Sequence, residues 1–344
     1  MAIRKTSRNI VIGGVALLVL YILMQRKPIE TSVPTIEENP VESCAKRKQD
    51  FFLRIVVLTY NRPKGLANCL QSLAEADYFG DTVDLDIWID RNKDNILDTA
   101  TYDAAISFNW SHGKMTVHSH PAHVGLYGQW LSTWSPTNWT CPEENAFFAE
   151  DDIVVSKAYY KWLKNMHLFY SNRTDISGFS LQKQITMAGP KTYRTISLPE
   201  KHSVFLYRIY GTWGFSPNKN VWQKFLAWYN EIKHDRYFQP YVPGILPTGW
   251  YKDHQKKNKA DEMWEIWFIY FNHIKDLYCL YPNHKDLDLV INKELPGLHY
   301  SKNKKISTKS LMKNLTIHGY ERSPMIIDYD GSVLSNKKLP FSTL

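Results

Sequence analysis

Segments with the pattern of buried strands alternate with segments with the pattern of amphipathic helices between residues 52 and 155. Two consecutive parallel strands need a long crossover connection, usually a helix, so strict alternation predicts a parallel sheet with helices on both faces. We therefore predict an α/β fold with a Rossmann-like, mostly parallel central sheet. Strands are expected at 53–59, 83–90, 114–120 and in the run that ends at Glu150, and helices at 66–74, 96–108 and 125–134.

Polar residues follow these strands at their carboxyl ends, which is the edge where open α/β sheets bind ligands. No GxGxxG pattern follows the first strand, and the chain contains no GxxxxGK[ST] pattern, which argues against a dinucleotide site and against a P-loop. The polar segments are Thr59-Tyr60-Asn61-Arg62 after the first strand, Asp90-Arg91-Asn92 after the second and Glu150-Asp151-Asp152 after the fourth.

The acidic triplet Glu150-Asp151-Asp152 ends an otherwise apolar run, FFAEDDIVV. Mutual repulsion and desolvation both oppose three adjacent carboxylates at the end of a buried strand. The charges either reach water at a turn or share a cation. Mg²⁺ and Mn²⁺ take oxygen ligands and leave coordination positions for substrate phosphates, so the placement after a central strand favours a metal site.

The amino-terminal region has the pattern of a membrane anchor followed by a stem. Residues 10–24 carry no charge, and Arg4, Lys5 and Arg8 precede them. The run is slightly shorter than the roughly 20 residues that span a bilayer, and it lacks a small-residue cleavage signature before Gln25, which favours an uncleaved signal anchor over a removed signal peptide. We expect a cytoplasmic tail at 1–8, a transmembrane helix at 9–25 and a proline-containing stem at 26–50.

The formal net charge of +8 does not point to nucleic acid, because the Lys and Arg residues are scattered along the chain. Four Asn-x-Ser/Thr sequons permit exposure to the secretory lumen without proving it. One or two disulfides are compatible with the four cysteines, although Cys69 on an apolar helix face also fits a plain buried thiol. The sequons are at Asn109, Asn138, Asn172 and Asn314, and the cysteines are Cys44, Cys69, Cys141 and Cys279.

The stretches RIVVLTYNRPKGLANCL, DIWIDRN and FFAEDDIVVSKAYYKWL together resemble the GT-A glycosyltransferases. The resemblance is greatest to the inverting N-acetylglucosaminyltransferases that extend N-glycan cores and O-mannose. It implies a glycosyltransferase domain at 51–300, a carboxy-terminal tail at 301–344, and a variant DxD motif at residues 150–152. It also implies that Asp152 binds Mn²⁺ or Mg²⁺ directly while Glu150 and Asp151 assist.

The same resemblance implies that Arg62 contacts the donor nucleotide and that Asp90 reads its base or ribose. Thr59, Asn61 and Arg91 are expected beside them as donor-binding residues. Gly125, in the turn HVGLYG, is expected to allow close approach to the donor, although a tight turn that needs glycine explains it equally well.

The second half of the chain is expected to supply the acceptor site and the general base. Trp213, between two glycines in YGTWG, is the candidate for stacking on an acceptor sugar, with plain core packing as the alternative. An inverting transfer needs a base for the acceptor hydroxyl, and Asp261 or Glu262 before the apolar helix pattern is the expected base, with Asp261 favoured. A charge that complements the helix dipole is the simpler reading of either acid. His299 is the candidate late metal or phosphate ligand.

The sequence thus predicts a type II Golgi membrane protein with a lumenal catalytic domain, the endoplasmic reticulum being the alternative compartment. The expected reaction moves a sugar, with N-acetylglucosamine as a candidate, from a UDP-linked donor to a glycan or glycoprotein acceptor, with Mn²⁺ or Mg²⁺. A retaining outcome stays open. A carbohydrate-binding protein without turnover is the main alternative, and a nucleotidyltransferase acting on sugar phosphates is disfavoured by the anchor and by the missing Gly-rich loop.

Overall fold

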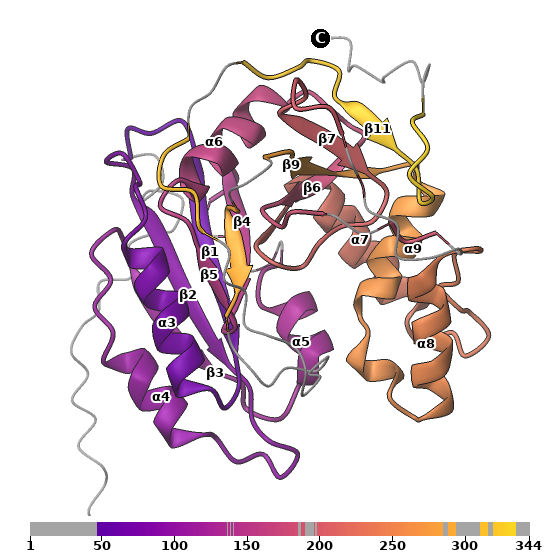
Figure 1. Cartoon of the computed structure of the whole chain (residues 1–344). Helices are drawn as coiled ribbons and strands as arrows, with labels where there is room; N and C mark the ends of the chain where they lie inside the picture. The colour runs from indigo at the N-terminus through magenta and orange to yellow at the C-terminus, as the bar shows by residue number, and fades with distance from the viewer. Residues whose placement is uncertain are drawn as a thin grey trace, which may run out of the picture. The chain divides into compact units, whose positions relative to one another are not determined.

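The described part of the chain forms a mixed α/β fold around a large, mostly parallel sheet, as the alternation predicted (Figure 1). The structure is a computed structural model that describes residues 47–135, 137, 139, 141–184, 187–189, 196, 198–284, 288–293, 310–315 and 319–334. These residues belong to one compact unit, Cys44–Leu344. The expected tail at 1–8, membrane segment at 9–25 and most of the stem lie outside them. Within the described residues, no helix is both long and apolar enough to cross a membrane.

The main sheet has the strand order β11-β7-β9-β6-β8-β4-β1-β2-β3. Strands β1 to β4 pair in parallel, and β8 runs antiparallel to both β4 and β6. A separate antiparallel pair joins β5 (Ile153–Val155) to β10 (Val290–Asn292). The strands of the main sheet are β1 (Phe52–Thr59), β2 (Val83–Ile89), β3 (Met115–Ser119), β4 (Glu144–Glu150), β6 (Ile176–Ser180), β7 (Val204–Tyr207), β8 (Phe215–Pro217), β9 (Tyr278–Pro282) and β11 (Met325–Ile327).

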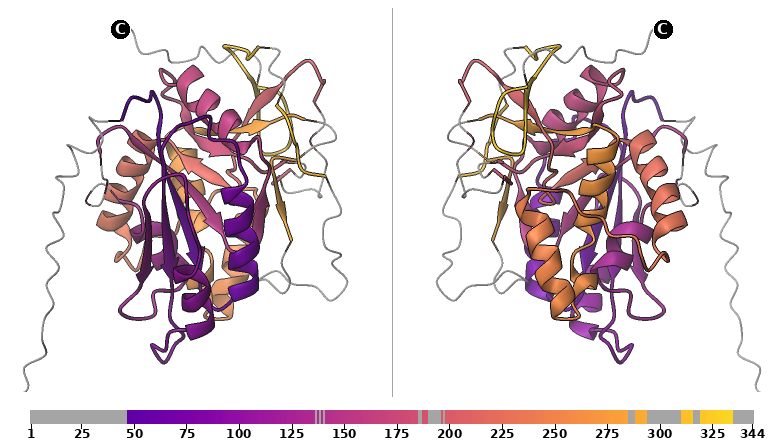
Figure 2. Two further views of the ribbon diagram at one scale, coloured as in Figure 1. Left: turned by 90° about the vertical axis from the view of Figure 1, so that its left-hand side faces the viewer. Right: turned by 90° about the vertical axis from the view of Figure 1, so that its right-hand side faces the viewer.

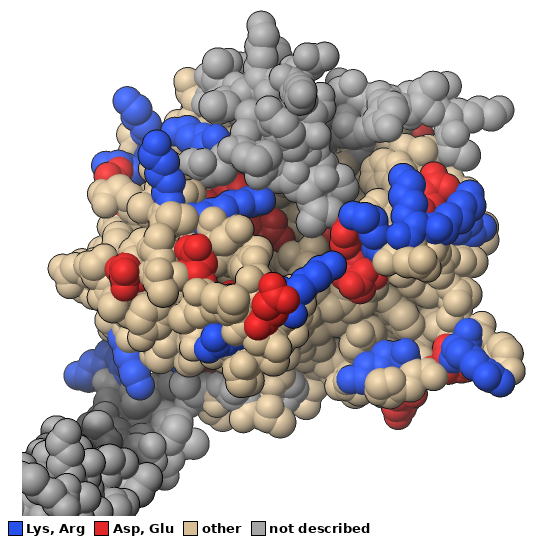
Figure 3. Space-filling model, turned by 90° about the horizontal axis from the view of Figure 1, so that it is seen from below, with Lys and Arg blue, Asp and Glu red and all other residues tan. Residues whose placement is uncertain are grey.

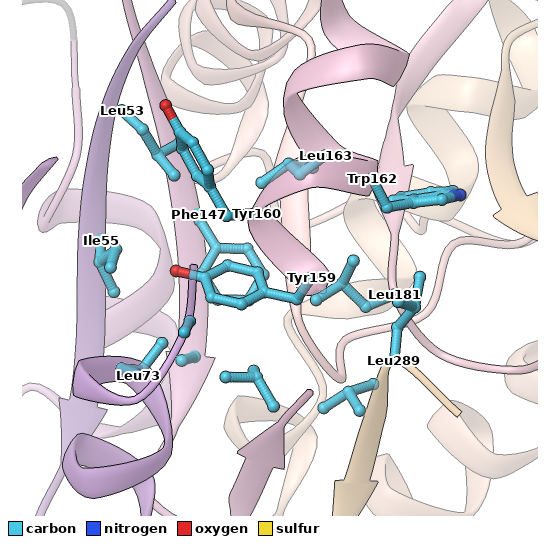
Figure 4. Packing of buried hydrophobic residues seen from close by; sticks show 14 of the residues in the cluster. Leu53, Ile55, Leu73, Phe147, Tyr159, Tyr160, Trp162, Leu163, Leu181 and Leu289 are labelled. Atoms are coloured by element: carbon cyan, nitrogen blue, oxygen red, sulfur yellow. The ribbon is translucent and has the colours of Figure 1, made fainter. Parts of the chain in front are cut away.

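Helices cover both faces of this sheet, because the central strands are apolar on both sides (Figure 2). Ile55 and Val57 of β1 enter one core with residues of α3 and α6, whereas Val56 and Leu58 enter the other core with residues of α5, α7 and α9. Figure 4 shows the first core, where Tyr159 of α6 packs beside Phe147 of β4. The helices are α3 (Pro63–Ala74), α4 (Thr99–Ile106), α5 (Gly125–Ser132), α6 (Tyr159–Phe169), α7 (Lys219–Ile232), α8 (Leu246–Lys256) and α9 (Glu265–Ile274), with a 3₁₀ turn η1 (Ala260–Glu262).

Local sequence explains where the helices near the sheet begin. Pro63 occupies the first turn of α3, where its fixed φ suits a helix and its missing N–H costs nothing. The buried residues Leu66, Cys69, Leu70 and Leu73 then follow at helical spacing, so one face of α3 packs on the sheet. In α4 the side chain of Asp98 accepts a hydrogen bond from the backbone N–H of Thr101 at 2.8 Å, which caps the helix.

The chain beyond residue 300, expected to be a tail outside the catalytic domain, contributes to the fold. β11 pairs in parallel with β7 at one edge of the main sheet. Ile326 and Ile327 are buried, and so are Met312 and Leu315 earlier in this region. The short apolar patch MII was too brief to identify as a strand, because three residues have no distinguishable periodicity.

A buried charge cluster lies in the amino-terminal halves of the central strands. The guanidinium of Arg54 donates to both carboxylate oxygens of Glu144 at 3.1 Å and to Asp86 at 3.0 Å, and it lies 3.7 Å from Asp84. Arg47 donates to Asp84 at 2.9 Å. Burial lowers the pKa of Arg54, but Asp86 and Glu144 more than compensate, so its net pKa lies above the usual value. Arg54 therefore ties β1 to both of its neighbours with a permanent charge.

Candidate functional site

Three sequence-predicted residues meet where β1 and β4 end. The hydroxyl of Thr59 donates to the Asp151 carboxylate at 2.7 Å, and the guanidinium of Arg62 donates to the same carboxylate at 3.1 Å. The backbone N–H of Asp151 bonds to Leu58 O at 3.1 Å, which extends the β1–β4 register by one residue. Burial raises the pKa of Asp151 to about 6, although Arg62 lowers it. Asp151 thus anchors the turn and orients Arg62.

Asp152 follows in the turn between β4 and β5. Its carboxylate accepts a hydrogen bond from the Asn292 side-chain amide at 2.8 Å and lies 3.8 Å from the Arg62 guanidinium. The backbone N–H of Lys293 donates to Asp152 O at 2.9 Å. The β5–β10 pair therefore fixes this turn through a segment that is 140 residues away in sequence. No local pattern identifies Asn292, because only strand pairing brings it to the site.

Glu150 and Glu265 form a second group of acids deeper in the site. The indole N–H of Trp130 in α5 donates to Glu150 at 3.0 Å. Burial, then the charge of Asp152, raises the pKa of Glu150 to about 8, and Glu265 also contributes. Burial raises the pKa of Glu265 to about 7. Both residues are half-buried, and the Oε2 atom of Glu265 is buried without a hydrogen-bond partner among the described residues.

Glu265, which the sequence analysis did not select, lies at the start of α9, whereas Asp261 and Glu262 lie in η1. The 3₁₀ turn η1 ends at Met263, where the backbone leaves helical geometry, and α9 starts afresh at Glu265. Asp261 is exposed, and Glu262 pairs with Lys259 at 2.9 Å. Of these three acids, Glu265 is the one that interacts electrostatically with Glu150. The sequence feature that could have pointed to Glu265 is its place directly after Trp264, in the acidic and aromatic segment 260–273.

Glu265→Gln is expected to stabilise the metal-free protein at high pH and to change little at low pH. A carboxyl whose folded pKa of about 7 exceeds its ordinary value of 4.5 contributes stability that is complete below pH 4.5 and lost as the pH rises through 7. Gln carries no charge, so the variant avoids this loss, which is about 1–3 kcal/mol. Urea unfolding of the wild type and the variant at pH 5 and pH 8, with a chelator present, measures this difference in the free energy of unfolding. Glu262→Gln is the matched control, and an equal effect of the two substitutions would contradict the assignment.

Asp90 holds the turn that starts α5. Its two carboxylate oxygens accept hydrogen bonds from the backbone N–H groups of Val124 and Gly125, both at 2.9 Å, and His123 Nδ1 lies 3.0 Å away. Gly125 has φ of +64°, a left-handed conformation that favours glycine. The structure therefore supports the tight-turn reading of Gly125, and it places Asp90 as a helix cap at the same edge of the sheet.

The other donor-binding candidates lie around this edge with different partners. The guanidinium of Arg91 donates to the backbone oxygens of His120 and Asn95, so it connects the loops after β2 and β3. Asn61 is exposed. Gln129, which the sequence analysis missed, is buried and donates to Thr59 O at 2.8 Å while its oxygen lies 3.2 Å from His120 Nε2. Gln129 thereby joins α5 to the ends of these strands.

The structure gives Trp213 a packing role. It is half-buried and packs against the core that contains Phe147. The neighbouring Gly214 has φ of +67°, and an added Cβ there would lie 3.1 Å from Leu181 and 3.2 Å from Phe147. The glycine at 214 is needed for this close approach. His299 lies outside the described residues.

The acidic residues of this turn offer carboxylate oxygens, which are the ligands that Mg²⁺ and Mn²⁺ prefer. Among the described residues, no group of three or more His, Cys, Asp or Glu side chains is arranged to hold an ion. A divalent cation bound through one or two carboxylates and completed by substrate phosphates does not need such a group. The Asp152 carboxylate lies in a turn whose neighbouring acids raise one another's pKa, so a cation would relieve their repulsion. The donor set therefore fits Mn²⁺ or Mg²⁺ when a diphosphate supplies the remaining ligands.

The surface around this edge carries charges of both signs. Figure 3 shows the lower side of the molecule in Figure 1, the face that carries α5 and α8. Acidic side chains lie in and around a hollow on this face, and basic side chains lie beside it.

Tyr127 of α5 donates to Ala260 O and Met263 O, both at 3.2 Å, and accepts from the Trp267 indole at 3.0 Å. These bonds connect α5 to η1 and α9.

Comparison with known proteins identifies no family for this chain. No protein-family model matches the sequence, and no curated protein matches it. One similar solved structure is the crystal structure of S. aureus TarS 1–349, with 15% sequence identity and a TM-score of 0.28. The match covers 41% of the present chain and 42% of that chain, which is less than half of each. A similarity of this size carries no conclusion about activity.

Proposed function

We propose that the protein is a glycosyltransferase that moves a sugar from a nucleotide-sugar donor to a hydroxyl of a glycan or glycoprotein. The observation that carries the proposal is the meeting of two acidic groups at the carboxyl edge of the parallel strands. Asp151 and Asp152 come from the turn after β4 with Arg62 beside them, and Glu265 comes from the start of α9. Glu150 connects the two groups. This edge is where open α/β sheets bind ligands.

The first group suits the diphosphate of the donor. The Arg62 guanidinium is about one-third exposed and lies near both Asp151 and Asp152, so it is oriented for an anion without being fully neutralised. Asp152 would hold Mn²⁺ or Mg²⁺. When bound, the cation stabilises the negative charge that develops on the leaving nucleoside diphosphate. We propose UDP as the nucleotide and N-acetylglucosamine as a candidate sugar, following the sequence resemblance.

The second group suits deprotonation of the acceptor. Glu265 is half-buried, and a pKa near 7 matches the range in which a carboxylate works as a general base at neutral pH. As the acceptor oxygen attacks the anomeric carbon, its proton passes to Glu265, and the bond from that carbon to the diphosphate oxygen breaks. A single displacement of this kind inverts the anomeric configuration.

The proposed location is the lumenal side of the Golgi membrane, with residues 9–25 as the anchor. Cys141 is disulfide-bonded, whereas Cys69 and Cys279 are free and buried. Disulfides persist in oxidising compartments such as the secretory lumen and are rare in the cytosol. The bond at Cys141 therefore supports this location.

Asp152→Asn is expected to abolish the metal-dependent part of donor binding. Asn has one neutral oxygen where Asp offers a charged carboxylate, so it is a poor ligand for a hard divalent cation. Differential scanning fluorimetry of residues 26–344 with UDP-sugars, with and without Mn²⁺, should show a shift of several degrees for the wild type and little for the variant.

The exposed Asp261→Asn is the matched control and should behave as the wild type. A shift that persists in Asp152→Asn would contradict the assigned ligand. Stabilisation by donors without turnover on any acceptor or water would instead favour a carbohydrate-binding protein.

A further inference from the structure

We propose that Asn109 and Asn172 carry N-linked glycans, on the edge of the sheet opposite the candidate active site. Both residues begin sequons, Asn109-Trp110-Ser111 and Asn172-Arg173-Thr174. The proposal goes beyond the proposed activity and rests only on the proposed lumenal location of the domain.

The structure presents Asn172 in an exposed turn. The backbone N–H of Arg173 donates to Tyr170 O at 2.9 Å, which closes a turn with Asn172 inside it, directly after α6. Asn172 and Thr174 are exposed, whereas Arg173 between them is buried and forms a two-pronged ion pair with Asp175. The middle residue of the sequon therefore points inward and anchors the turn, while the two residues that define the sequon face solvent.

Asn109 has the same arrangement. Asn109 and Ser111 are exposed, and Trp110 between them is buried, with its indole N–H donating to Val83 O at 2.8 Å. Val83 is the first residue of β2, so this bond places the sequon at the amino end of the parallel strands. In both sequons a large buried side chain fixes the loop, and the asparagine is left on the surface.

The topology separates both sequons from the acids of the candidate site. Asn109 lies between α4 and the start of β3, and Asn172 lies between α6 and the start of β6. β3 is parallel to β2, and β6 has the same direction as β4 because both are antiparallel to β8. Both sequons thus lie at the amino edge, whereas Asp151, Asp152 and Glu150 lie at the carboxyl edge. Glycans at these positions leave the donor and acceptor sites open.

The modification transfers an oligosaccharide from a lipid diphosphate to the asparagine, and an enzyme of the host cell catalyses this transfer. The asparagine amide nitrogen forms a bond to C1 of the oligosaccharide, and one amide proton is released. The bond between C1 and the diphosphate oxygen breaks, and the lipid diphosphate leaves with its electron pair.

The test uses the full chain expressed in a eukaryotic secretory cell, with a short carboxy-terminal tag that carries a reporter sequon. An amidase that releases N-glycans converts each occupied Asn to Asp, and peptide mass spectrometry then locates the occupied sites. We expect conversion at Asn109 and Asn172. Asn109→Gln and Asn172→Gln should each remove one glycan-dependent step in electrophoretic mobility.

Thr174→Ser keeps the Asn172 sequon and Thr174→Ala destroys it, so the serine variant should retain the glycan and the alanine variant should lose it. A glycosylated reporter with unmodified Asn109 and Asn172 would overturn the proposal while leaving the proposed location intact. An unmodified reporter would overturn the lumenal location itself, and the glycans with it. Neither result concerns sugar transfer, which the Asp152→Asn experiment tests separately.

Discussion

Glu265→Gln is expected to lower the turnover number of sugar transfer by about 10²–10⁴-fold, because the acceptor hydroxyl loses the base that takes its proton. Gln keeps the shape of the side chain and cannot accept a proton. Donor affinity should change little, since Arg62 and Asp152 lie in the other acidic group. Steady-state kinetics with a UDP-sugar and a glycan acceptor separate the two effects, as a loss in kcat with the donor KM unchanged.

The pH profile gives an independent check on the same residue. A base with a pKa of about 7 is protonated and inactive at low pH, so kcat/KM of the wild type should fall below pH 7. Glu265→Gln should flatten this limb of the profile at its residual rate. Asp261→Asn and Glu262→Gln are the matched controls. If either of these variants loses turnover while Glu265→Gln keeps it, the base is in η1 and the assignment to α9 is wrong.

Arg54→Met is expected to lower the free energy of unfolding by about 3–5 kcal/mol, because it leaves buried carboxylates without their cation. Met retains much of the volume, so the loss of charge dominates over the creation of a cavity. Glu144 loses two hydrogen bonds at 3.1 Å and Asp86 loses one at 3.0 Å. The midpoint of urea unfolding, with the slope checked for a two-state transition, measures the change.

Two further variants locate the cause of this loss. Arg47→Met should cost less, because the Arg47 side chain is 22% exposed and Asp84 retains Arg54 at 3.7 Å. Adding Glu144→Gln to Arg54→Met should recover part of the stability, since the uncompensated charge is then removed. A double variant that is less stable than Arg54→Met alone would show that packing, and not charge, sets the cost.

Half of the candidate site could be predicted from the sequence, because it follows from where single strands end. The residues at the carboxyl ends of β1 and β4 include Thr59, Arg62, Asp151 and Asp152, and the structure brings these four together. Parallel neighbouring strands bring their carboxyl ends to one edge, so identifying the strands was enough to group these residues. The role expected of Asp90 was less secure, because a carboxylate at a strand end can also cap the next helix, as it does here.

The other half depended on contacts between distant segments. Glu265 was missed because the pattern of residues 260–273 reads as one helix, whereas the backbone breaks at Met263 and restarts at Glu265. Asn292 and Gln129 were missed because each acts across the fold, on Asp152 and on Thr59 respectively. Neither contact has a signature within its own segment.

The sequence by itself determined the strand and helix alternation, the parallel core and the acidic turn after the fourth strand, because burial periodicity is a local property of the chain. Only the tertiary structure decided which acid faces Glu150, which residue holds Asp152 in place, and that residues beyond 300 complete the sheet. These features depend on how segments more than a hundred residues apart pack together. Such packing is set by the whole core, and no single stretch of sequence records it.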